Sequence, residues 1–170
     1  MENQLLESFA YILPAAVTGI VAYYMLNGFL KNKNSEKKLE LLAQQKRESL
    51  PIRLQAYERM LLFCERINPV KMLLRIKPLT TITEDYLQLL IANIEQEFEH
   101  NLVQQIYLSN DTWLAVVAAK NAIINKLKQV AENANSANEL RENVLIEYTK
   151  ILPPTETAIG FIKNEVRKLL

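Results

Sequence analysis

The chain has 170 residues, with 20 Lys and Arg against 19 Asp and Glu, so its net charge is +1. Three Gly exclude collagen-like and Gly-rich disordered chains, and a single Cys excludes a disulfide scaffold and a zinc site built on paired thiolates. Apolar residues recur at helical spacing, without the alternation typical of strands. The sequence therefore predicts an all-α fold, with an N-terminal transmembrane helix followed by a cytosolic multi-helix bundle.

The first predicted element is the transmembrane helix at residues 9–30, which follows a short extracytoplasmic N-terminus at 1–8. Its 22 residues include no Asp, Glu, Lys, Arg or His. A helix of that length measures about 33 Å, enough to cross the roughly 30 Å hydrocarbon core of a bilayer. Because acidic Glu2 and Glu7 precede the segment, where a signal peptide would be basic, we expect a retained anchor.

Small residues recur within this span. Ala15 and Gly19 are four residues apart, and Ala22 continues near the same helix face. Small side chains at this spacing permit close contact between membrane helices. These three residues are therefore candidates for helix packing within the membrane.

A basic juxtamembrane linker helix is predicted at 31–49. Its cations are Lys31, Lys33, Lys37, Lys38, Lys46 and Arg47. Because the cytoplasmic flanks of membrane helices carry the excess of Lys and Arg, we expect the N-terminus outside and the C-terminal domain in the cytoplasm. The first four lysines are candidates for contact with anionic lipid headgroups, at about 1 kcal/mol each. Since this position explains the charge, no nucleic acid partner is expected.

The charges of the chain fall into segregated blocks. Residues 1–30 carry −2, residues 31–77 carry +7, residues 78–119 carry −6 and residues 120–170 carry +2. If the acidic block contacts the basic block of the same or a neighbouring chain, their attraction contributes to assembly. Assembly of that kind would weaken sharply with added salt.

The cytosolic helical domain is predicted at 50–170. A linker helix that begins near residue 35 continues to residue 67, with Pro51 either kinking it or starting a new helix. Further helices are expected at about 69–76, 84–107, 110–133, 137–151 and 155–170. The second half of the linker helix that ends at residue 67 has a coiled-coil-like apolar stripe at Leu50, Leu54, Tyr57, Leu61 and Cys64.

Short polar residues precede several of these helices and are candidate N-caps. They are Asn68, Thr83, one of Ser109, Asn110 and Asp111, and one of Ser136 and Asn138. Because the loops between the helices are short, we expect neighbouring helices to be antiparallel.

The residues that could carry chemistry favour no enzyme. Glu97 and His100 have the Glu-x-x-His spacing of di-iron sites, but His100 is the sole His and its predicted position faces solvent. Cys64 lies on an apolar stripe, as a buried structural cysteine does. The three Gly are too far apart for a phosphate-binding loop. We therefore expect no catalytic residue, metal or cofactor.

Several polar or aromatic residues are instead candidates for interaction. Asn101 and Gln105 are predicted on the apolar face of their helix, where unpaired amides cost about 1–3 kcal/mol. Lys120 falls within an apolar stripe that includes Trp113, and it either extends to solvent or meets Glu95 or Glu99. These residues form either an intramolecular network that fixes helix register or an oligomer interface. The full candidate set is Asn101, Gln105, Lys120, Trp113, Arg53 and Tyr57.

Two runs of the chain carry a family resemblance. They are Leu50 to Arg59 (LPIRLQAYER) and Glu97 to Tyr107 (EFEHNLVQQIY), followed by Ser109, Trp113 and Ala119-Lys120. With these residues the chain resembles an uncharacterised family of small, membrane-anchored helical proteins of Bacteroidota type. The resemblance covers most of the chain and implies a bacterial inner-membrane location, and it implies no activity.

Three classes of function remain at this stage. The first is a non-enzymatic inner-membrane scaffold or self-assembling helical protein, whose partners are membrane lipids and copies of itself. The second is an accessory subunit of a larger transport, motor or secretion complex, which would dock through the charge blocks. The third is a metal-binding or enzymatic helical bundle, which the single His disfavours.

Overall fold

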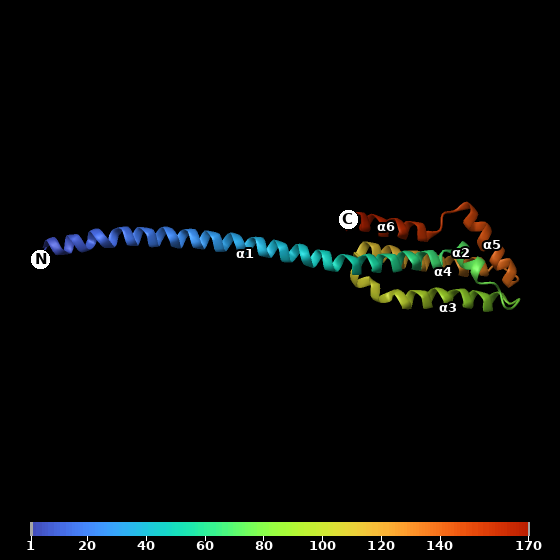
Figure 1. Ribbon diagram of the computed structural model, residues 1–170. Coiled ribbons are helices and arrows are strands. Elements are labelled where there is room, and N and C mark those ends of the chain that lie inside the picture. Colours follow the sequence, from blue (N-terminus) through green and yellow to red (C-terminus); the bar gives the residue numbers. More distant parts are fainter. Residues whose placement is uncertain (1, 170) are drawn as a thin grey trace. The chain divides into compact units, whose positions relative to one another are not determined.

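The computed structural model describes the backbone of residues 2–169 and the side chains of residues 17–31, 33, 36–42, 44 and 48–169. Every regular element in this range is a helix (Figure 1). The prediction of an all-α protein is therefore confirmed for these residues. The elements are α1 (Glu2–Ile67), α2 (Pro69–Arg75), α3 (Thr83–Asn101), the 3₁₀ helix η1 (Leu102–Tyr107), α4 (Asn110–Ala131), α5 (Ala137–Lys150) and α6 (Pro154–Leu169).

The predicted membrane span and the predicted linker helix belong to one element, α1, which passes through Pro51 without a break. The alternative in which Pro51 starts a new helix is therefore wrong. A proline inside a helix removes one backbone hydrogen bond, and α1 accommodates this loss. Among the described side chains, no helix combines the length and apolar character needed to cross a membrane. Residues 9–16 of the predicted span have side chains outside the described ones.

The chain divides into two compact units, residues 1–49 and residues 50–170. In the first unit, the large apolar side chains described between Val17 and Leu42 are 48–72% exposed. The second unit contains the end of α1 and all later helices, and its interior is almost wholly apolar.

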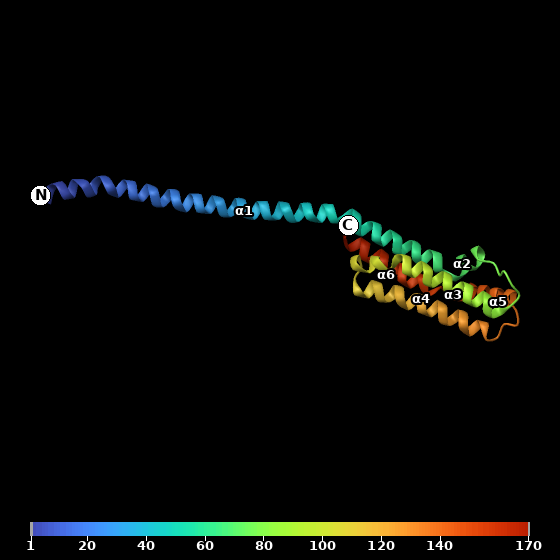
Figure 2. The ribbon, with the colours of Figure 1, turned by 90° about the horizontal axis from the view of Figure 1, so that it is seen from below.

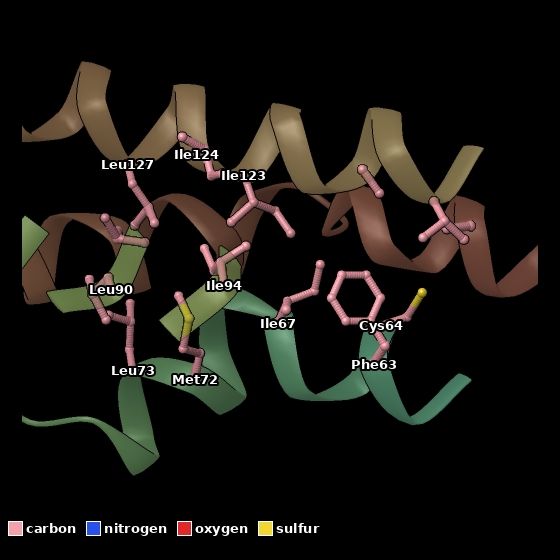
Figure 3. Packing of buried hydrophobic residues seen from close by; sticks show 14 of the residues in the cluster. Phe63, Cys64, Ile67, Met72, Leu73, Leu90, Ile94, Ile123, Ile124 and Leu127 are labelled. Atoms are coloured by element: carbon pink, nitrogen blue, oxygen red, sulfur yellow. The ribbon is translucent and has the colours of Figure 1, made fainter. Parts of the chain in front are cut away.

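The core of the second unit draws side chains from every α-helix in it. Figure 3 shows Phe63 and Ile67 of α1 and Ile94 of α3 lying with Ile123 and Leu127 of α4 in one interior. From the other elements, Met72, Leu140, Val144, Ala158 and Ile162 complete the same cluster. Packing of this kind holds the short helices α2 and α5, which would be only marginally stable alone in water.

Three of the predicted caps are confirmed. The Asn68 side chain accepts from the Val70 and Lys71 amides, and Ser109 and Ser136 accept from the amides three residues later. The cap predicted at Thr83 is wrong, because α3 begins at Thr83 itself after Ile82. The Thr83 hydroxyl instead donates to the Ala134 carbonyl at 3.1 Å, which joins the start of α3 to the loop between α4 and α5.

The helix predicted at 84–107 is also shorter than expected. It ends at Asn101, and the chain continues as η1 to Tyr107. A 3₁₀ helix has about 3.0 residues per turn in place of about 3.6, so side chains after Asn101 leave the face that helical periodicity gave them. Leu102, Val103 and Ile106 are accordingly 40–69% exposed.

The helix α6 lies beside α4 and runs antiparallel to it. The two helices are in extensive contact and can be followed in both views of the ribbon (Figures 1 and 2). Glu165, near the end of α6, binds Ser109 at the start of α4, which fixes the antiparallel direction. This pair of helices forms the surface considered below.

Candidate interaction surface

Lys120 on the inner side of α4 forms an ion pair inside the bundle. Its Nζ lies 2.7 Å from both carboxylate oxygens of Glu95 on α3. The lysine is 9% exposed, whereas the Glu95 side chain is 42% exposed, so the pair reaches from the core to the edge of the bundle. Glu95 is one of the two acids that the sequence offered as a partner. Lys120 therefore has an intramolecular role that fixes α3 against α4.

Trp113 lies next to this ion pair. Its ring stacks on Phe98 with centroids 5.5 Å apart, and the Lys120 ammonium sits 4.6 Å from the centroid of the Phe98 ring. Cation–π contacts of this kind add about 0.5–2 kcal/mol, depending on exposure. Trp113 and Lys120 thus belong to one internal cluster of α3 and α4.

Arg53 and Tyr57 belong to a second internal network. Arg53 donates to the Tyr57 hydroxyl at 3.2 Å, and that hydroxyl lies 2.8 Å from a Glu165 carboxylate oxygen. The same carboxylate accepts from the Ser109 amide and hydroxyl at 2.9 and 2.8 Å. The network therefore joins α1, the start of α4 and α6.

The environment of this network shifts the pKa of two of its groups. Burial acts to raise the pKa of Glu165, but hydrogen bonds from Thr112, Ser109 and Tyr57 outweigh it and the pKa is lowered. Burial and the hydrogen bond to Glu165 raise the pKa of Tyr57. The network therefore favours an ionised Glu165 carboxylate that accepts a hydrogen bond from the neutral Tyr57 hydroxyl.

One of the two predicted core amides lies elsewhere than expected. Asn101 is half-buried and donates to the Glu97 carbonyl at 2.8 Å, within its own helix. Gln105 is exposed, because it lies on η1 after the change of helical period. The expectation that both amides share the apolar face of Phe98 is thus wrong for Gln105.

The residues considered for chemistry are separated. His100 is exposed, and Glu97 pairs with Arg66 at 2.8 Å. Within the described part of the chain, no three His, Cys, Asp or Glu side chains cluster as metal ligands would. Cys64 is fully buried, and burial raises the pKa of its thiol to about 12. A thiol with that pKa is protonated at neutral pH and is a poor nucleophile.

The residues predicted to meet the membrane lie in the first unit. Lys31, Lys33, Lys37 and Lys38 are exposed, and Lys33 sits 5.0 Å from the centre of the Phe29 ring. A methyl group added at Gly19 would meet nothing within 4 Å, and Ala22 is exposed. Ala15 has its side chain outside the described residues.

An apolar groove of about 620 Å³ runs between the outer sides of α4 and α6. Two large apolar side chains border it, Leu114 on α4 with 63% exposure and Phe161 on α6 with 44% exposure. Small residues form most of the remaining wall. The full lining is Asp111, Leu114, Ala115, Ala118, Ala119, Ala122, Pro154, Thr157 and Phe161.

This groove was not found from the sequence, although a signal for it exists. Asp111 carries the sole charge in the lining. The outward positions of α4 continue with Asn121, Asn125 and Gln129, so this stripe has no Lys, Arg or Glu. Solvent-facing helix stripes usually carry charged residues. An alanine-rich stripe with a single charged residue, Asp111, on an exposed helix therefore indicates a surface suited to contact.

A family model described as a family of unknown function (DUF7935) matches residues 3–169, nearly the whole chain. No curated protein and no solved structure matches the chain.

Proposed function

The chain belongs to this family of unknown function, and we propose that it is a non-enzymatic, membrane-anchored helical protein that self-assembles at the cytoplasmic face of a bacterial inner membrane. The observation that carries the proposal is the groove of α4 and α6. A groove of about 620 Å³ with one charged residue in its lining exposes apolar side chains to water, and such surfaces commonly bind a partner.

The internal networks support the same proposal indirectly. Lys120 and Tyr57 each have a partner on another helix of the bundle and hold those helices in register, and Asn101 has a partner within its own helix. An oligomer interface built on them would need to break those contacts. Self-assembly through the apolar groove needs no internal contact to be broken, so the groove is the better candidate for the interface.

The proposed anchor rests on the sequence of the N-terminal region. Residues 9–30 have no charged side chain, and Lys31 and Lys33 follow directly. A helix of this kind is retained in a bilayer with its basic flank in the cytoplasm. Anchoring would also raise the local concentration of the bundle, because tethered partners meet more often than free ones.

The experiment is a mild-detergent purification of the full tagged chain from membranes of its native host, with mass spectrometry of everything that copurifies. The same sample is analysed by light scattering for its mass. Recovery from the membrane fraction as an oligomer of the bait alone supports the proposal. A strict monomer without a partner, or recovery in the soluble fraction, contradicts it.

An accessory subunit of a larger membrane complex is the second candidate, and the acidic block favours it. Residues 78–119 hold six acids and no Lys or Arg, and Glu84, Asp85, Glu99 and Asp111 are exposed. Such a surface would bind a basic partner. Stoichiometric copurification of foreign subunits, lost at high salt, would select this function over self-assembly.

A further inference from the structure

We infer that the α4–α6 groove is occupied by the same groove of a second copy of the chain, with the two α4 helices antiparallel across a two-fold axis at Ala118. The inference rests on the proposed function of self-assembly and names the surface and the symmetry by which it occurs. Two-fold pairing is the commonest symmetry of protein oligomers, and it requires a patch that complements itself.

The side-chain sizes along α4 meet this requirement. In an antiparallel pair centred on Ala118, Leu114 of one copy lies opposite Ala122 of the other. The exposed Leu114 is then the knob, and the small Ala122 leaves the space that receives it. Ala118 at the axis allows the two helix backbones to approach closely. Each copy supplies both the knob and the hole, so the match occurs twice.

The charges along the same stripe also fit a second copy. Asp111 lies opposite Asn125 in this pairing, and both side chains are exposed. The two Asp111 carboxylates are about 21 Å apart along the helix axis, well beyond the Debye length of about 8 Å at physiological salt. No pair of like charges therefore meets across the axis. The lining offers a partner a single carboxylate, Asp111, and no cation, so a strongly charged partner would be poorly matched, which favours a copy of the chain itself.

The size of the patch suits a dimer held at a membrane. With 22 and 16 residues, α4 and α6 are about 33 Å and 24 Å long, and each is about 10 Å wide, which gives on the order of 570 Å². A standard interface buries about 800 Å² on each partner. The patch alone is slightly small, and tethering of both copies to one membrane compensates by raising their effective concentration.

The test is the mass of the full chain in mild detergent, measured by sedimentation equilibrium for wild type, Ala118→Glu and Ala92→Glu. Ala92 is an exposed alanine on α3, so its variant is a matched control for the added charge. We expect a dimer for wild type and Ala92→Glu. Ala118→Glu should raise the dissociation constant about a hundredfold, because two carboxylates meet at the axis. Circular dichroism checks that all three proteins keep the same helix content.

A swap of knob and hole tests the register itself. Leu114→Ala and Ala122→Leu should each weaken the dimer on the order of tenfold, and the double variant should recover most of the loss. Recovery cannot arise from a general loss of folding. Single-variant losses that simply add in the double variant would overturn the register, and hence the inference.

The dependence of association on salt concentration distinguishes this dimer from assembly through the charge blocks. The groove has little charge, so we expect the dimer to persist between 50 mM and 500 mM salt. Dissociation at high salt, or an Ala118→Glu dimer as tight as wild type, overturns the inference while self-assembly itself stands. A monomeric wild type overturns the proposed function and the inference together.

Discussion

The inner and outer faces of α4 differ in what completes them. The inner face carries Val116, Ile123 and Leu127, each fully buried by other helices of the bundle. Its one charged residue, Lys120, is paired with Glu95. The outer face carries Leu114, Ala118 and Ala122, which remain exposed within the part of the chain that the structure describes. The side chains of the inner face are therefore covered by other helices of the same bundle, whereas those of the outer face stay exposed and are available for contact with a second copy.

A polar residue within a buried apolar stripe and an apolar residue on an exposed stripe indicate different things. The first indicates a contact within the fold, and the second indicates a binding surface. A buried lysine paired with a carboxylate adds little net stability, because desolvation offsets the attraction, and its contact aligns the two helices. An exposed leucine beside alanines contributes little to folding, because it stays in contact with water. The second feature is the better guide to a binding surface, as contiguous exposed apolar patches usually are.

The largest difference between the faces should appear when the same substitution is made on each. Leu127→Ala opens a cavity in the core and should lower the free energy of unfolding by about 3 kcal/mol. Leu114→Ala removes an exposed side chain and should change it by less than about 0.5 kcal/mol. Urea denaturation of both variants in the Ala118→Glu background measures folding without a contribution from assembly. Equal losses would remove the distinction between the faces.

A smaller effect is expected at the ion pair of the inner face. Glu95→Ala leaves the Lys120 ammonium buried without its partner and should cost about 1–2 kcal/mol. Lys120→Met removes the charge and keeps most of the volume, so it should be nearly neutral. Thermal unfolding followed by circular dichroism compares the two. If Lys120→Met were less stable than Glu95→Ala, this would contradict the claim that the inner face is stabilised mainly by apolar packing.

The network at the start of α4 should show its effect in the pH dependence of stability. The pKa of Glu165 is lowered in the folded chain, so its contribution is present above the pKa of about 4.3 of an unfolded Glu. It is lost as the pH falls through the lower folded value. Glu165→Gln should therefore be about 1 kcal/mol less stable than wild type at pH 7, and the gap should narrow toward pH 3.

The control for that measurement is Glu156→Gln on the same helix, since Glu156 is exposed. Urea midpoints of the three proteins at pH 7, 5, 4 and 3 give the profile. A gap between wild type and Glu165→Gln that is constant with pH would show that the carboxylate does not stabilise the fold through its charge.

The helices and their caps were largely predictable, because they depend on local sequence. Asn68, Ser109 and Ser136 cap their helices through contacts with amides two or three residues away. The end of α3 at Asn101 was not predictable from periodicity, since the apolar pattern continues through Leu102 and Ile106 while the backbone tightens to a 3₁₀ helix. Thr83 has a cap-like position and instead binds Ala134, a partner 51 residues away.

The candidate surface was the hardest part to predict. Its two walls come from Leu114 and Phe161, which are far apart in the sequence, and only the antiparallel packing of α4 and α6 joins them. Arg53, Tyr57, Asn101 and Lys120, which were chosen from the sequence, have their partners within the bundle, whereas Gln105 lies exposed on η1. Side-chain type identifies a residue that needs a partner, and tertiary structure decides whether the partner is in the same chain.

The central claim is that the outer face of α4 binds the same face of a second copy. The most direct test is to form a disulfide between the two copies at the proposed two-fold axis. Ala118→Cys should form a self-linked dimer under mild oxidation of the full chain in membranes, because the two residues 118 face each other. Cys64 is buried, with its pKa raised to about 12, so it should remain unlinked. A dimer band from Ala118→Cys and none from the matched control Ala92→Cys is the expected result. Equal linking of both variants, or linking of neither, would contradict it.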